Sequence, residues 1–186
     1  HSNATELLAN LNKILVVTKK QLQEATHVII TYGTSWVYRN IEKDTIVANC
    51  HKMPQKQFAK ELLTVEKIKE SIENTIRLIQ TINSNCNFIF TVSPVRHLKD
   101  GFVENQRSKS HLITAFHSLL SENHNLKSEY FPSYEIMMDE LRDYRFYAED
   151  MLHPSHIAID YIWERFKEST ISETAYPTMD IVESIQ

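Results

Sequence analysis

The fold is decided by the stretch HVIITYG, residues 27–33, a β-branched run that stops at a glycine. Continuous apolar runs of this length are typical of strands that are buried on both faces of a sheet. A second stretch, NFIFTVSP at residues 87–94, has the same character and ends at a proline, which cannot donate to a central ladder. Each stretch therefore predicts a buried strand, and each predicted strand leads into a loop.

Helical patterns lie before, between and after these two stretches. Apolar residues recur at helical spacing over residues 5–23, and Thr64 precedes an isoleucine stripe in residues 65–79. The remaining predicted elements are helices at 104–120, 134–141 and 154–166, a short strand at 129–131, and a hairpin of 36–39 with 45–48. Strands that alternate with helices predict an α/β fold with a parallel sheet and helices on both of its faces. Functional residues of such sheets gather in the loops at the carboxyl ends of the strands.

The composition fits one globular domain without a nucleic-acid or membrane partner. Of 186 residues, 42% are hydrophobic and 24% are charged, and the net charge is -4. An acidic balance gives no footprint for nucleic acid, and the apolar runs are far shorter than the roughly 20 residues that cross a bilayer. Cys50 and Cys86 lack CxxC spacing, which favours a reducing compartment and predicts a cytoplasmic location.

Both ends of the chain are expected to lie outside the domain, which we place at residues 5–168. Residues 1–4 resemble a vector remnant, although proteolysis of a longer protein could equally produce such a start. Residues 169–186 are polar and weakly patterned, which predicts a peripheral tail.

The sharpest chemical signal is DMLHPS, residues 150–155. A separation of three residues across a turn lets the carboxylate of Asp150 reach a ring nitrogen of His153, which fixes the tautomer and stabilises the imidazolium. Pro154 suits the first position of a helix, so His153 is expected at the helix N-terminus. The other interpretation of the pattern is a histidine helix cap with an incidental aspartate.

Longer motifs carry a resemblance to a known family. A DxxHP element before the last helix of a small α/β chain resembles the final block of the SGNH (GDSL-like) hydrolase superfamily, where it completes a serine triad. Four further motifs resemble the bacterial GSCFA family: ITYGTSWVYR at 30–39, VANCHK at 47–52, FTVSPVRH at 90–97 and DYRFYAED at 143–150. The resemblance runs from about residue 26 to residue 166.

The resemblance implies a flavodoxin-like three-layer fold and a serine-dependent esterase or acyltransferase. Its substrate is expected to be a small O-acyl ester, such as an O-acetylated carbohydrate, and no cofactor is expected. Asp150 and His153 are then the acid and the base of the triad.

The same resemblance suggests residues for the oxyanion and the substrate. Gly33 matches the glycine that opens the superfamily's third block, but the usual oxyanion asparagine of that block falls at Ser35. Asn49 is a candidate substitute for that asparagine. The other residues expected to bind substrate or oxyanion are Thr34, Arg96 and His97.

The motif that gives the GSCFA family its name is not found in these residues. That motif holds the presumed nucleophilic serine, which is therefore expected upstream; Ser35 and Ser93 are weaker candidates. The sheet is accordingly expected to lack its first strand or strands, and the 186-residue chain is expected to be inactive alone. An exposed edge at residues 27–32 then predicts self-association.

Two other functions compete with the triad. A metal-dependent hydrolase would use side chains of the types that bind zinc, although no HExxH or CxxC spacing supports it. Its candidate ligands are Cys50, His51, His97, Asp150 and His153. A non-catalytic binding module would use aromatic and arginine side chains of the loops, whose chemistry suits a ligand such as a sugar. Its candidate residues are Trp36, Tyr38, Arg96, His97, Arg145 and Tyr147.

Overall fold

A parallel sheet of three strands forms the centre of the computed structural model, which describes residues 3–124 and 126–185. Its strands are β1 (His27–Tyr32), β5 (Asn87–Val92) and β6 (Ser128–Phe131), in the order β1-β5-β6. β1 and β5 run in parallel with Tyr32 opposite Val92, so their carboxyl ends lie side by side. The strands predicted from the two apolar stretches and from residues 129–131 are confirmed, and so is the α/β class. The expected burial is confirmed for β5 only: β1 is at the edge of this sheet, and every second residue of it is exposed.

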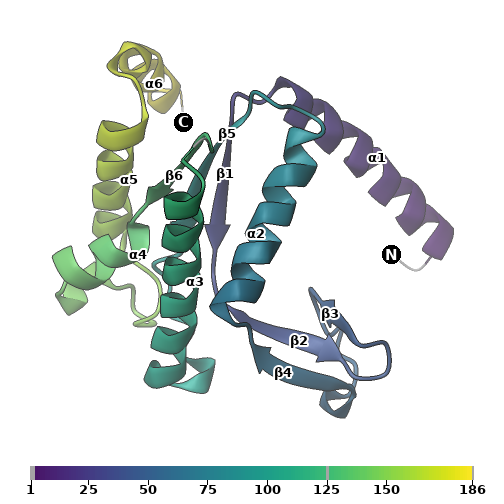
Figure 1. Ribbon diagram of the computed structural model, residues 1–186. Helices are drawn as coiled ribbons and strands as arrows, with labels where there is room; N and C mark the ends of the chain where they lie inside the picture. The colour runs from purple at the N-terminus through teal and green to yellow at the C-terminus, as the bar shows by residue number, and fades with distance from the viewer. Residues whose placement is uncertain (1–2, 125, 186) are drawn as a thin grey trace.

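Helices cover the two faces of this sheet unequally. α2 (Val65–Gln80) and α3 (Phe102–Glu122) pack against the face that carries Phe88, Phe90 and Val92, and they complete the main core there (Figure 1). The stripe predicted after Thr64 is the buried side of α2, and the Thr64 hydroxyl accepts a hydrogen bond from the amide of Lys67.

The opposite face is covered only towards β6. α5 (His156–Thr170) contacts it through Phe166, whose ring meets that of Phe131 edge to face. Beside it lie α4 (Ser133–Glu135) and η3 (Ile136–Glu140), which is π-helical where a single helix was predicted. Over β1 this face stays open, and Ile29 is 54% exposed. Helices thus flank the sheet on both sides, but the second layer does not reach β1.

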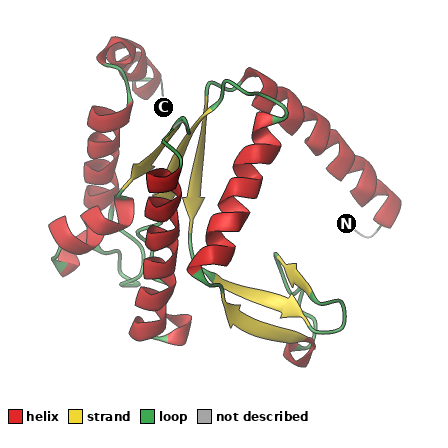
Figure 2. Cartoon of the chain, in the orientation of Figure 1, coloured by secondary structure: helices red, strands yellow, loops and turns green. Residues whose placement is uncertain are grey.

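A second, antiparallel sheet follows β1 and is separate from the first (Figure 2). The predicted hairpin is confirmed as β2 (Trp36–Asn40) and β3 (Thr45–Val47). A third strand, β4 (Phe58–Leu62), pairs with β2 after the short turn η1 (Gln55–Gln57) and was not predicted.

The N-terminal helix α1 (Ala4–Glu24) lies apart from the core (Figure 1). Asn3 caps its first turn, and none of the α1 residues that the structure describes is buried. Its apolar stripe is therefore open to solvent; Leu8 and Leu15 are examples. At the other end, the side-chain amide of Asn83 donates to the carbonyl oxygens of Leu22 and Ala25 at 3.0 and 2.8 Å.

The last helix begins later than the sequence predicts. Ser155 is the N-cap of α5 and its hydroxyl accepts from the amide of Ala158, so Pro154 lies outside the helix. Pro154 instead forms an isolated β-bridge with Tyr147, seven residues earlier, and this pairing overrides the preference of proline for a first helical turn.

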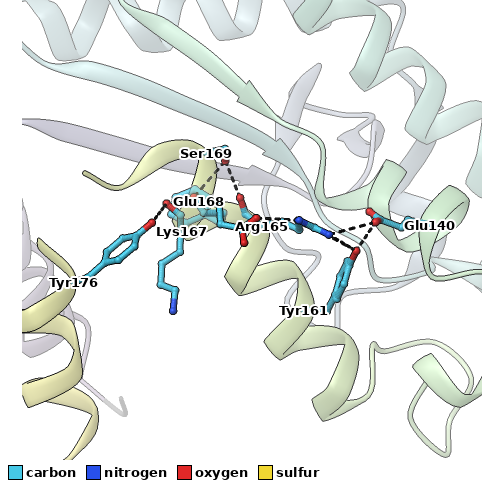
Figure 3. Close-up of polar contacts among 8 residues, drawn as sticks. Glu140, Tyr161, Arg165, Lys167, Glu168, Ser169 and Tyr176 are labelled. Atoms are coloured by element: carbon cyan, nitrogen blue, oxygen red, sulfur yellow. Dashed lines mark hydrogen bonds and ion pairs between the residues drawn. The ribbon is translucent and has the colours of Figure 1, made fainter. Parts of the chain in front are cut away.

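Beyond α5 the chain continues through η5 (Glu173–Ala175) and α6 (Tyr176–Glu183). The hydroxyl of Tyr176 donates to the carbonyl oxygen of Lys167 and ties this segment to α5 (Figure 3). On the other side of α5, Arg165 donates to the hydroxyl of Tyr161 at 2.8 Å and pairs with Glu168 at 2.9 Å. Residues 1–2 of the suspected vector remnant and residue 186 of the tail lie outside the described residues. In the described parts of the chain, every helix is too short or too polar to cross a bilayer.

Candidate active site

Asp150 and His153 form a hydrogen-bonded pair in the segment before α5. Asp150 Oδ2 lies 2.6 Å from His153 Nδ1, while Asp150 Oδ1 accepts from the backbone amides of Leu152 and His153 at 2.9 and 3.0 Å. The His153 amide, then the Leu152 amide and the imidazole, lower the pKa of the Asp150 carboxyl to about 2. A carboxylate that is ionised at neutral pH can only accept, so Nδ1 of His153 carries the proton and Nε2 is the unprotonated nitrogen of the neutral ring.

A tight turn, and not a helix N-terminus, holds this pair. The amide of Ala148 donates to the carbonyl of His153 at 2.8 Å, and the amide of Ser155 donates to the carbonyl of Phe146 at 2.8 Å. Between these bonds the chain reverses through Met151, whose φ is 60°. The side chains of His153 and Asp150 are 60% and 45% exposed, so the imidazole is accessible to a substrate.

Arg96, in the loop after β5, attaches that loop to the turn. Its amide donates to the carbonyl of Leu152 at 3.1 Å, and Nη1 donates to the carbonyl of Met151 at 3.4 Å. The guanidinium lies 3.8 Å from the centre of the Tyr147 ring, in a cation–π contact. Arg96 and Tyr147, two residues proposed for recognition, therefore lie next to the Asp150–His153 pair.

His97, in the loop after β5, lies against the loop after β1. Partial burial of its ring, followed by the charges of Lys109 and His153, lowers its pKa below the ordinary value. A Cβ atom at Gly33 would lie 3.1 Å from His97 Nε2, which is tighter than a relaxed contact. Glycine at position 33 therefore lets the imidazole of His97 lie against the backbone after β1.

Thr34 and Ser35 are bound to α3. The amide of Ser35 donates to Ser108 Oγ at 2.8 Å, and the Ser35 hydroxyl donates to the Ser108 carbonyl at 2.9 Å. The hydroxyls of Thr34 and Ser108 share a hydrogen bond of 2.8 Å. Because Ser35 is only 1% exposed, its hydroxyl and amide are engaged inside the protein.

The structure does not connect the other predicted residues to the pair. Asn49 follows β3 at the second sheet, where its Oδ1 accepts from the amide of His51 at 2.7 Å. Trp36 and Tyr38 belong to β2, and the guanidinium of Arg145 lies over Phe146. In the described part of the chain no three histidine, cysteine, aspartate or glutamate side chains form a group that could hold a metal. The metal-dependent alternative therefore has no geometric support from these residues.

One set of buried polar residues was missed by the sequence analysis: Asn105, Ser108 and Lys109 on one face of α3. Asn105 Oδ1 accepts from the amide of His97 at 2.8 Å, and Ser108 holds Thr34 and Ser35. The spacing of three and four residues continues the line of Leu112 and Phe116, which face the core. That continuity was a usable signal, because polar residues in line with an apolar stripe are directed inward.

The comparisons with known proteins give one family and no closer relative. Among curated proteins and among solved structures, none matches the chain significantly. The sequence model of the GSCFA family matches residues 1–166, which include both strand loops and the Asp150–His153 turn. The chain therefore belongs to the GSCFA family.

Proposed function

We propose that this chain supplies the acid and the base of an SGNH-type serine esterase or acyltransferase. The observation that carries the proposal is the bond from His153 Nδ1 to the Asp150 carboxylate, 2.6 Å long. A carboxylate in this position orients the imidazole and stabilises the imidazolium that forms during acyl transfer. The substrate class is a small O-acyl ester, such as an O-acetylated carbohydrate.

In the proposed reaction His153 Nε2 accepts the proton of a serine hydroxyl while the serine oxygen bonds to the acyl carbon. His153 then returns this proton to the alkoxide that leaves, and an acyl-enzyme remains. Water, or an acceptor alcohol, attacks the acyl carbon and loses its proton to the same nitrogen; the bond from the acyl carbon to the serine oxygen then breaks, and His153 returns the proton to that oxygen. Hydrolysis and transfer differ only in this second nucleophile.

The proposal places the nucleophile on a serine that precedes β1, as the family resemblance implies. The two serines considered inside the chain have other partners, which supports this placement. Ser35 is buried and donates to Ser108, and Ser93 Oγ accepts from the amide of Val95 at 3.3 Å. In the same proposal the sheet is flavodoxin-like, and further strands pair with the open edge of β1.

The test is intact-mass measurement after treatment with a fluorophosphonate, which reacts with activated serines. We expect a stoichiometric adduct on the complete gene product and none on residues 1–186 alone. The His153→Ala variant of the complete product should lose or greatly slow the adduct. His156→Ala is the matched control, because His156 is exposed and lies three residues further on. The absence of any adduct on the complete product, or equal rates with His153→Ala, would overturn the proposal.

A second candidate is a binding module without catalysis, and the contact of Arg96 with Tyr147 favours it. In that case calorimetry would detect binding of an acetylated oligosaccharide to a protein that forms no fluorophosphonate adduct. Arg96→Met would weaken this binding. The free thiols of Cys50 and Cys86 lead us to propose a cytoplasmic location for either function.

A further inference from the structure

The ammonium group of Lys109 lies at the point where the two strand loops meet. Lys109 comes from α3 and is 1% exposed. Its Nζ donates to the carbonyl oxygens of Gly33 and Ser93 at 2.8 and 2.7 Å. These residues directly follow β1 and β5, which are neighbouring parallel strands. One side chain therefore joins the carboxyl ends of both strands.

Joining the loops does not by itself require a charge. On the same face of α3, Asn105 binds the backbone of His97 and Ser108 binds the backbone of Ser35 with neutral groups. Lysine is rarely buried completely, because its charged form loses hydration. Burial lowers the pKa of Lys109 to about 8, so the group is still mainly protonated at neutral pH. A neutral donor would hold the same two carbonyls without this cost, which indicates that the charge has a separate role.

The ammonium of Lys109 and the ring of His97 both lie against Gly33: the Gly33 carbonyl accepts from Nζ at 2.8 Å, and a Cβ atom at Gly33 would lie 3.1 Å from His97 Nε2. After the larger effect of burial, the positive charge of Lys109 disfavours the protonated form of His97, and a protonated His153 acts in the same direction. Tyr134 from α4 is also close to this ammonium, with its ring centre 5.2 Å from Nζ. Arg96 adds a further positive charge beside His97 in the same loop.

We propose that Lys109 is a positioning residue of this site: its ammonium fixes the loops after β1 and β5 to each other and keeps the imidazole of His97 neutral. A neutral His97 next to Gly33 can exchange hydrogen bonds with a bound substrate, and it does not compete with His153 as a proton donor. The part of this inference that concerns catalysis rests on the proposed esterase or acyltransferase function.

The first experiment is an NMR titration of the histidine rings in residues 1–186. In Lys109→Met, which keeps the length of the side chain and removes its charge, the titration midpoint of His97 should move upward. Two controls separate charge from structure. Lys69→Met removes a lysine that pairs with Glu122 at the C-terminal end of α3, and Ser108→Ala loosens the loop after β1 without a change of charge. Neither should move the midpoint of His97. An unchanged midpoint in Lys109→Met would overturn the proposal.

A second measurement needs no variant and tests the bridge between the two loops if Lys109→Met does not fold. The carbonyl carbons of Gly33 and Ser93 should titrate together in the unaltered protein, with one midpoint near pH 8. Separate midpoints for the two carbonyl carbons would contradict a shared ammonium and with it the proposal.

Fluorophosphonate labelling of the complete gene product then separates this inference from the proposed function. Slower labelling of Lys109→Met supports a positioning role, whereas an unchanged rate refutes that role and leaves the serine hydrolase intact. If the unaltered complete product is not labelled at all, the proposed function fails, and the titrations still decide whether Lys109 controls His97.

Discussion

Ser108→Ala should destabilise the protein, although it removes a single oxygen atom. Ser108 Oγ accepts from the amide of Ser35 at 2.8 Å and shares a hydrogen bond with the Thr34 hydroxyl. Ser35 and Ser108 are both 1% exposed, so water cannot replace the lost acceptor. The Thr34 hydroxyl is less affected, because it keeps its bond from the amide of Trp36 at 3.1 Å.

The size of the destabilisation follows from the backbone amide of Ser35, which loses its hydrogen-bond acceptor. An unsatisfied buried donor costs about 1–3 kcal/mol, so we expect a loss of about 2 kcal/mol in the free energy of unfolding. For a domain of this size 1 kcal/mol changes Tm by roughly 2–4 °C, which predicts a decrease of about 4–8 °C. Thermal unfolding followed by circular dichroism measures this change.

Ser110→Ala is the matched control for this prediction. Ser110 is on the same helix and exposed, and its hydroxyl donates to the carbonyl of Arg107. Both substitutions gain the same helix propensity from alanine, so the difference in Tm between them isolates the buried amide. Equal Tm values for the two variants would refute the idea that α3 holds the loop after β1 through Ser108.

Three further predictions concern the site and the sheet. Asp150→Asn in the complete gene product should slow fluorophosphonate labelling by roughly 10³–10⁴-fold, because an amide does not hold the required tautomer of His153; Asp143→Asn, at an exposed carboxylate, should have no effect. The low pKa of Asp150 means that its carboxyl binds a proton more weakly in the folded protein than in the unfolded chain, where the ordinary value is 3.8. The contribution of the Asp150 carboxylate to the free energy of unfolding should therefore be complete above about pH 4 and be lost as the pH falls through about 2. The carboxyl carbon resonance of Asp150 measures this titration, and a titration midpoint above about pH 4 would contradict the hydrogen bonds described. Residues 1–186 should self-associate in sedimentation velocity as their concentration rises, and Ile29→Lys should weaken this association by placing a charge on the β1 edge; a wild-type chain that remains monomeric at high concentration would refute the prediction.

Local patterns were sufficient for the elements that form the main core. Ile68, Ile72 and Ile76 recur every four residues and predict the buried face of α2, and the continuous apolar runs predict β1 and β5. β4 was not predicted because its sequence, FAKEL at residues 58–62, is short and has the charged residues Lys60 and Glu61 at its centre. Its status as a strand depends on pairing with β2, where Arg39 forms an ion pair with Glu61 at 2.7 Å.

The site was predictable where its chemistry is local and not where it depends on distant partners. Asp150 and His153 are three residues apart, and their side chains meet within one turn. The position of Pro154 depends instead on Tyr147, which only the folded chain brings to it. Lys109 is of a residue type that usually faces solvent. Its partners, the carbonyl oxygens of Gly33 and Ser93, follow two strands that are remote from it in sequence.

The position of α1 implies an uneven distribution of local stability along the chain. Asn83 anchors its last turn, whereas the 21 residues of the helix bury no side chain in the main core. Isolated helices are only marginally stable in water, so such a helix opens by fraying while the sheet remains closed. Amide hydrogen exchange should therefore be fast at the start of α1, slower beside Asn83 and slowest in β5. A segment that lies across the apolar stripe would raise the protection of α1 toward that of the core, and exchange rates would then report, residue by residue, where that segment lies.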